Sequence, residues 1–296
     1  MKKTLIKLRH VLRRVSIGIF LKLFGFPSLN RRVEQRIIFS WSVLSKSFPE
    51  TYALDVACGS GYLTRLMIES QSLMTVGIDV RRNIISTAHR IAKSQSSRCH
   101  FFVADAHFLP FKENVFSKIF CNCSLEHFAD DSKVLSEIYR ICLHNGKLFL
   151  TVDSMKQQLS PISLAFGRAL SDDKIKILEK RGLALSDAFK VHHRMEYYVV
   201  NFYTFKNLSL KLCCAGFKIE GHQSYFSNIT GFVFELHDGI IRFLHWDSDL
   251  AMVLFPIFYP LTFLDGPDKE GYGLAVYARK CSTLVDKSNL KNPKLG

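Results

Sequence analysis

The stretch from Ala53 to Thr64 constrains the fold of this 296-residue chain more than any other, and it reads ALDVACGSGYLT. Apolar residues on both sides of Asp55 predict a buried parallel strand, and the small residues after it predict a tight turn into a helix. Gly59 and Gly61 lack a Cβ, so the backbone can turn sharply and a ligand can lie directly against it. A carboxylate beside this turn would repel a diphosphate, and it suits a ligand that carries an ammonium group.

Two further segments repeat the pattern of an apolar strand that ends in an acid. LMTVGID ends at Asp79, 24 residues after Asp55, where a carboxylate is placed to accept the two hydroxyls of a ribose. HFFVAD ends at Asp105, and two more strands are predicted over residues 116–123 and 146–153. One glycine turn is a weak signal, but this ordered set predicts a parallel α/β sheet that binds its ligand at the carboxyl ends of its strands.

With these motifs in this order, residues 50–155 resemble the class I S-adenosylmethionine-dependent methyltransferases, in the small-molecule branch called methyltransferase type 11. The resemblance implies an α/β fold with a Rossmann-like sheet of seven strands, mostly parallel with an antiparallel last strand, and helices on both faces. It also implies S-adenosylmethionine (SAM) as the cofactor, with Asp79 on the ribose and Asp105 at the adenine. The implied cofactor-binding residues are Asp55, Ala57, Cys58, Gly59, Gly61, Asp79, Val80, Asp105, Ala106 and Asn122.

Positive charge is concentrated at the two ends of the chain. The net charge is +14, of which residues 1–52 carry +9, residues 279–296 carry +4 and the body between them only +1. This distribution disfavours a nucleic-acid groove lined by the body and favours an anionic surface that the ends contact. Eight cysteines without zinc-type spacing indicate a reduced, cytoplasmic protein.

Residues 1–30 are predicted to form a basic amphipathic extension, because residues 1–26 contain no acid and repeat leucine at helical spacing. Lys22 interrupts the apolar stretch and no small-residue cleavage site follows, which argues against a signal peptide. The apolar run is also too short to span a bilayer. Two alternatives remain for this helix: it lies on an anionic membrane at the inner, cytoplasmic face, or it packs on the domain.

The rest of the chain is predicted to divide into three parts. Residues 31–155 form the SAM-binding core, residues 156–281 complete the sheet, and residues 282–296 form a loose basic tail. An insertion at residues 222–271 contains fifteen uncharged residues, in which Pro256 and Pro260 are expected to break a helix. This insertion is either the core of a subdomain or an apolar wall, lid or membrane-dipping element for a greasy acceptor.

Three histidines are the candidate catalytic residues. His127 follows the predicted fourth strand, where a methyl acceptor would approach, and it could act as a general base. A structural role at a helix start is the alternative for this residue. His192 and His193 lie in a segment that often lines the acceptor pocket in the family, and Asp153 after the fifth strand is a further pocket candidate.

A metal site is not predicted. Glu126-His127 resembles the Glu-x-x-Glu-His pattern of the metal-assisted O-methyltransferases of quinone synthesis, but Cys123 stands at the first Glu position. Magnesium prefers oxygen ligands, so this replacement argues against it.

The predicted function is therefore SAM-dependent methyl transfer to a small-molecule or lipid-linked acceptor. An RNA or DNA methyltransferase is one alternative, although the chain has Asn122-Cys-Ser-Leu125 where base N-methyltransferases show Asn/Asp-Pro-Pro-aromatic, and it has no Pro-Cys nucleophile motif. A non-catalytic adaptor that keeps the fold is the other alternative.

Overall fold

The computed structural model describes residues 29–44, 52–71, 74–92, 98–154, 201, 203–226, 230–233, 236, 255–262 and 271–281. The predictions for residues 1–28, for His192 and His193 and for the tail at 282–296 lie outside these ranges. One compact unit comprises residues 1–34, 156–191 and 224–272, and a second comprises residues 35–155, 192–223 and 273–296. Within the described ranges, no helix combines the length and apolar character that crossing a bilayer requires.

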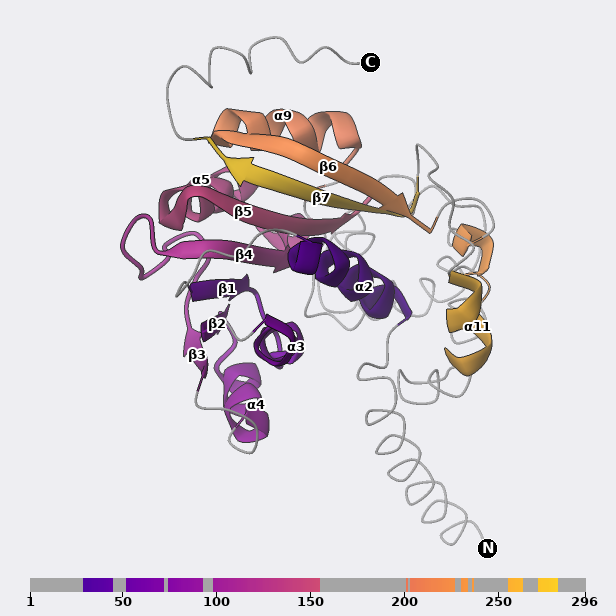
Figure 1. The fold of residues 1–296 in the computed structure, drawn as a ribbon, viewed down its shortest axis with the longest axis horizontal. Coiled ribbons are helices and arrows are strands. Elements are labelled where there is room, and N and C mark those ends of the chain that lie inside the picture. The colour runs from indigo at the N-terminus through magenta and orange to yellow at the C-terminus, as the bar shows by residue number, and fades with distance from the viewer. Residues whose placement is uncertain are drawn as a thin grey trace, which may run out of the picture. The chain divides into compact units, whose positions relative to one another are not determined.

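Seven strands form one sheet in the order β3-β2-β1-β4-β5-β7-β6 (Figure 1). The strands are β1 (Tyr52–Val56), β2 (Met74–Asp79), β3 (Cys99–Val103), β4 (Phe116–Asn122), β5 (Cys142–Asp153), β6 (Phe217–Tyr225) and β7 (Gly273–Lys280). Parallel pairing runs from β3 through β2, β1 and β4 to β5, whereas β7 is antiparallel to β5. The predicted Rossmann-like fold is confirmed, and its topological switch point lies between β1 and β4.

Helices cover both faces of the sheet, as the alternation of side chains along the strands requires. They are α2 (Leu29–Leu44), α3 (Tyr62–Gln71), α4 (Arg82–Ala92), the short 3₁₀ helix η1 (Leu125–His127), α5 (Asp131–Ile141) and α9 (Phe205–Ala215). A further helix, α11 (Phe255–Leu261), belongs to the other unit. Ile119 and Leu148 belong to the core cluster that includes residues of α5 and α9. Their neighbours Phe120 and Phe149 belong to the cluster that includes residues of α2 and α3.

Strand β5 begins at Cys142, four residues earlier than predicted, and α5 ends at Ile141. The His-Asn-Gly sequence before the predicted strand indicated a turn. Instead, Asn145 adopts a left-handed backbone (φ 61°) inside the strand, and the pairing register with β4 shifts nearby. An irregularity of this kind absorbs turn-forming residues without ending the strand.

The helix α11 contains both prolines that were expected to break a helix. Pro256 is its second residue, where the backbone nitrogen needs no intrahelical acceptor. Pro260 lies inside a helix of only seven residues, so few hydrogen bonds are lost. Strand β6 likewise runs on to Tyr225, and it therefore occupies the first residues of the range 222–271.

Lys118 is a buried cation in the middle of β4. Its side chain is 1% exposed, and its Nζ donates to the carbonyl of Ser42 in α2 at 2.7 Å. Burial lowers the pKa of Lys118 to about 8, because the low-polarity interior disfavours the charged form. The contact ties the carboxyl end of α2 to the sheet.

Two long stretches of chain begin and end at neighbouring positions. Ser154, directly after β5, forms a parallel bridge with Tyr203. In the other unit, the Tyr272 N–H donates to the Phe226 carbonyl at 3.1 Å. Gly271 lies so close to this turn that a Cβ on it would sit 2.3 Å from the Tyr225 carbonyl oxygen.

Candidate functional site

The turn after β1 combines three residues with left-handed backbone conformations. Ala57 and Gly59 have φ of 55° and Gly61 has φ of 75°, of which Ala57 is the strained non-glycine case. The Cys58 N–H donates to the carbonyl of Ile78 at 2.8 Å, which ties this turn to β2. The sequence thus builds a rigid turn at the carboxyl ends of two neighbouring strands.

The two glycines of this turn face different surroundings. A Cβ on Gly59 would meet nothing within 4 Å, so open space lies against the backbone there. A Cβ on Gly61 would lie 2.3 Å from Cε1 and 2.4 Å from Cζ of the Phe101 ring. Gly59 therefore leaves room for a ligand, whereas Gly61 leaves room for a core side chain.

Asp55 is held inside the domain beneath this turn. It is 3% exposed, and its Oδ2 accepts a hydrogen bond of 2.6 Å from the Thr64 hydroxyl in α3. The contact joins the end of β1 to the first turn of α3, so the acid orients the loop between them.

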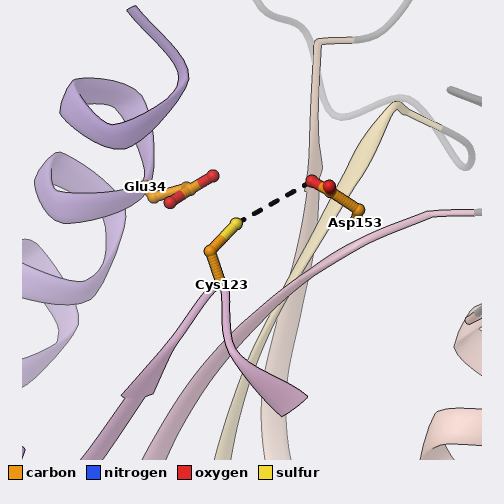
Figure 2. A group of neighbouring side chains, drawn as sticks. All are labelled: Glu34, Cys123 and Asp153. Atoms are coloured by element: carbon orange, nitrogen blue, oxygen red, sulfur yellow. Dashed lines mark hydrogen bonds between the residues drawn. The ribbon is translucent and has the colours of Figure 1, made fainter. Parts of the chain in front are cut away.

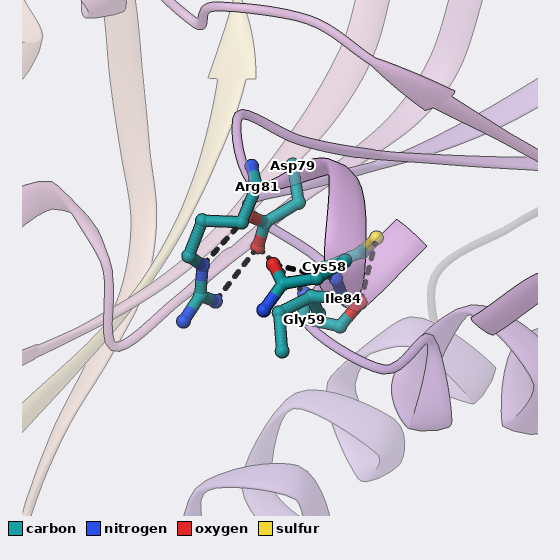
Figure 3. A network of polar contacts seen from close by, with 6 residues as sticks. Cys58, Gly59, Asp79, Arg81 and Ile84 are labelled. Atoms are coloured by element: carbon teal, nitrogen blue, oxygen red, sulfur yellow. Dashed lines mark hydrogen bonds and ion pairs between the residues drawn. The ribbon is translucent and has the colours of Figure 1, made fainter. Parts of the chain in front are cut away.

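Asp79, the last residue of β2, receives hydrogen bonds from four donors (Figure 3). The Gly59 N–H reaches Oδ2 at 3.1 Å, and the Arg81 N–H reaches Oδ1 at 3.0 Å. The Arg81 guanidinium adds two bonds, from Nε to Oδ1 at 2.9 Å and from NH2 to Oδ2 at 3.0 Å. Burial would raise the pKa of Asp79, but the hydrogen bonds from Arg81 and Gly59 outweigh it and hold the pKa below its usual value. Next to this acid, Val80 is 66% exposed.

Asp105 follows β3 and is held by His107. Its Oδ1 accepts from the His107 N–H at 2.9 Å and lies 2.7 Å from His107 Nδ1, and these contacts lower the pKa of Asp105. The neighbouring Ala106 is 5% exposed and belongs to the core, so only its backbone is available to a ligand. The His107 ring packs edge-on against Phe128, with ring centroids 5.6 Å apart.

The carboxyl ends of β4 and β5 bring Asn122, Cys123 and Asp153 together. Asn122 is 7% exposed and its Oδ1 accepts from the Thr151 hydroxyl at 3.0 Å. Cys123 has a left-handed backbone (φ 47°), a strained conformation for a non-glycine residue. Its thiol points toward Asp153 and donates to Oδ1 at 3.8 Å (Figure 2).

His127 ends the 3₁₀ helix η1 directly after this corner, and it is partly exposed. Asn201 brackets it: the Asn201 N–H donates to the Glu126 carbonyl at 3.1 Å, and its side-chain nitrogen donates to the Phe128 carbonyl at 2.8 Å. The loop that carries His127 is therefore fixed from both sides by one residue.

An ion pair between a buried acid and a partly exposed lysine lies at the start of the following helix, α5. Asp131 is 4% exposed, and its two oxygens accept from the Tyr203 hydroxyl at 2.5 Å and from Lys211 Nζ at 2.6 Å. Burial and the hydrogen bond to Asp131 raise the pKa of Tyr203. This pair anchors the returning segment near residue 203 to α5.

Residues 54–150 match the model of a family described as a methyltransferase domain. This segment is a class I SAM-dependent methyltransferase domain. Its cofactor is SAM, and the open space beside Gly59, next to the acid that ends β2, leaves room for such a ligand.

The curated relatives of the methyltransferase domain are named for different substrates. Demethylmenaquinone methyltransferase of Thermus thermophilus is 27% identical over 168 residues, covering 56% of this chain and 74% of that enzyme. Phosphoethanolamine N-methyltransferase 2 of Caenorhabditis elegans is 28% identical over 105 residues, covering 35% of this chain but only 24% of that protein.

The fold recurs in solved methyltransferases. Phosphoethanolamine N-methyltransferase 2 of Haemonchus contortus, in complex with phosphomonomethylethanolamine and S-adenosylhomocysteine, superposes with a TM-score of 0.59 at 19% identity. The match covers 90% of this chain and 57% of that chain. At this identity the likeness shows the shared fold.

Three residues that donate hydrogen bonds to the acids of the site were not predicted from the sequence: Thr64, Arg81 and His107. Arg81 and His107 each stand two residues after an acid, the spacing at which an Asp side chain captures a backbone N–H. That local signal could have found both. Thr64 lies nine residues from Asp55, and only the strand-turn-helix geometry brings the two together.

Proposed function

We propose that the protein transfers the methyl group of SAM to a small-molecule acceptor, including a lipid-linked acceptor at the cytoplasmic face of a membrane. The observation that carries this proposal is the open backbone at Gly59 beside the Asp79 carboxylate, at the carboxyl ends of β1 and β2. Ligands of open α/β sheets bind outside these strand ends.

SAM supplies an electrophilic methyl group on a sulfonium, and the protein must hold this group in line with the acceptor. In the proposal, Asp55 and the turn at residues 57–61 surround the methionine part, Asp79 accepts from the ribose, and Asp105 with the Ala106 backbone meets the adenine. The proposed SAM site is also lined by Cys58, Val80 and Asn122. Such positioning can supply most of the acceleration in a bimolecular displacement.

His127 is the proposed general base for an acceptor that must lose a proton. It lies after β4, past the end of the strand that carries Asn122, and Asn201 fixes its loop on both sides. Asp153 places a carboxylate at the end of β5, and this carboxylate would bind a hydroxyl or ammonium group of the acceptor. His192 and His193 remain proposed acceptor-pocket residues on the sequence argument alone.

The acceptor class and the membrane contact rest on two different supports. Relatives named for demethylmenaquinone and for phosphoethanolamine point to small molecules that carry an apolar tail or a charged amine. The basic ends of the chain, with +9 over residues 1–52 and +4 over residues 279–296, favour an anionic membrane surface. The near-neutral body argues against nucleic acid as the acceptor.

The first test is calorimetric titration of the full chain with SAM, comparing wild type with Asp79→Asn and Asp130→Asn. Asp79→Asn removes the charge that accepts the ribose hydroxyls, and we expect SAM affinity to fall about 10- to 100-fold, since a hydrogen bond to a charged group is worth about 1.5–3 kcal/mol. Asp130 is the N-cap of α5, and Asn caps a helix as well as Asp does. This control makes the same charge change and should bind SAM as wild type does.

The second test follows labelled methyl transfer from SAM to a demethylated quinone, to phosphoethanolamine and to RNA, with and without anionic vesicles. Transfer to one of the first two acceptors, increased by anionic but not by neutral vesicles, is the expected result. Transfer to RNA alone, with binding that falls steeply as salt rises, would overturn the acceptor proposal. A flat SAM titration for wild type would favour the non-catalytic adaptor.

A further inference from the structure

The guanidinium of Arg81 occupies the oxygens of Asp79 that a ribose would need. An ionised carboxylate offers about four lone-pair sites, and four donors fill them here: the Gly59 N–H, the Arg81 N–H, and Nε and NH2 of Arg81 (Figure 3). The Asp79 side chain is only 3% exposed with Arg81 in this position. The acid is both saturated and shielded.

The four donors divide into two that are fixed and two that can leave. The Gly59 N–H belongs to a turn held by the bond from Cys58 to Ile78, and the Arg81 carbonyl accepts from Ile84 and Ile85 at the start of α4. Both backbone donors are therefore immobile. The Arg81 side chain has a flexible stem and is 29% exposed, so its guanidinium can move into solvent.

The number and geometry of the departing donors match those of a ribose. The guanidinium places two parallel N–H groups on the two carboxylate oxygens, and the 2′- and 3′-hydroxyls of a ribose place two O–H groups. After Arg81 leaves, the two backbone donors still stabilise the charge of Asp79.

We propose that Arg81 is an internal competitor of the cofactor, which occupies the ribose-binding oxygens of Asp79 in the free enzyme and must leave them when SAM binds. The proposal rests on the proposed role of Asp79 toward the ribose. SAM and its product S-adenosylhomocysteine carry the same ribose, so the competition weakens both by the same factor. It makes the vicinal diol a requirement for tight binding.

The test is calorimetric titration of full-length wild type, Arg81→Met and Arg82→Met with SAM and with S-adenosylhomocysteine. Methionine keeps the length of the side chain but has no donor. We expect Arg81→Met to bind both ligands roughly three- to tenfold more tightly, since a partly exposed ion pair is worth up to about 1 kcal/mol and each further hydrogen bond adds to it. Arg82, the first residue of α4, is exposed, and the same change there should leave both affinities unchanged.

Salt provides a second, independent reading. Raising the salt concentration from about 0.05 to 0.5 M screens the Arg81–Asp79 pair, so the affinity of wild type should rise relative to that of Arg81→Met. Equal or weaker binding by Arg81→Met would overturn the proposal, as would the same salt response in both proteins.

The Asp79→Asn variant separates failure of this proposal from failure of the proposed function. If wild type binds SAM, Asp79→Asn does not and Arg81→Met is unchanged, only the competitor is refuted. If Asp79→Asn binds as wild type does, or if wild type itself does not bind, the role of Asp79 is wrong and the competitor falls with it.

Discussion

The same substitution at two glycines, two residues apart, should cost more stability at one position and more cofactor affinity at the other. Both Gly59→Ala and Gly61→Ala place a Cβ on a left-handed residue, which costs roughly 1–2 kcal/mol. Gly61→Ala also drives its Cβ to 2.3 Å from the Phe101 ring, and overpacking of this kind adds about 1–3 kcal/mol. Gly61→Ala should therefore lose about 2–5 kcal/mol of the free energy of unfolding, against about 1–2 kcal/mol for Gly59→Ala.

The binding effect should run the other way. The Cβ of Gly59→Ala enters the open space where we expect the cofactor, so SAM affinity should fall at least tenfold in a variant that remains folded. Urea denaturation measures the first quantity and calorimetric titration the second. Normal SAM binding by Gly59→Ala would refute the assignment of that space to the cofactor. Equal destabilisation by the two variants would refute the overpacking argument at Gly61.

Three further changes test features of the domain. Burial lowers the pKa of Lys118 to about 8, whereas the unfolded chain keeps about 10.5, so the unfolded state binds more protons between these values. The free energy of unfolding should therefore rise from pH 8 to 10.5, by up to about 3 kcal/mol, and Lys118→Met should lack this rise in pH-dependent urea denaturation. Tyr203→Phe removes a donor from the buried Asp131 carboxylate and should lose about 1–3 kcal/mol by the same assay, while an unchanged stability would show that Lys211 alone satisfies that acid. Asn201→Ala releases one side of the η1 loop, so kcat for methyl transfer should fall while the SAM dissociation constant stays constant; a parallel loss of SAM affinity would contradict a role confined to the acceptor side.

The local patterns of the chain were sufficient to predict the first three strands of the sheet. Each of the first three strands is a short apolar run followed by an acid, and this signal depends only on neighbouring residues. The resemblance supplied the strand order and the antiparallel last strand, which no local pattern contains. The early start of β5 was missed because Asn145 and Gly146 indicate a turn, whereas the pairing with β4 carries the chain through them as strand.

The partners of the site residues could be predicted only in part. The acids near the strand ends could be identified from the sequence. The hydrogen bonds that these acids accept from Thr64, Arg81 and His107 depend on the geometry of turns and helix starts. Lys118 illustrates the limit: a lysine inside an apolar strand gives no sign of its acceptor, which is a carbonyl 76 residues away in α2.

The contacts that join the two ends of each long stretch of chain have a consequence for which sequence changes this enzyme can accept. The bridge between Ser154 and Tyr203, and the hydrogen bond between Tyr272 and Phe226, hold the departing and returning chain side by side. The entropy of closing a loop grows only slowly with its length, by about 0.6 kcal/mol for each doubling. We therefore expect that either segment can be lengthened, shortened or exchanged for that of another methyltransferase. The hydrogen-bonding register of the sheet strands would stay the same. Recombination at these two pairs of positions would test whether either segment sets the choice of acceptor, on an unaltered cofactor domain.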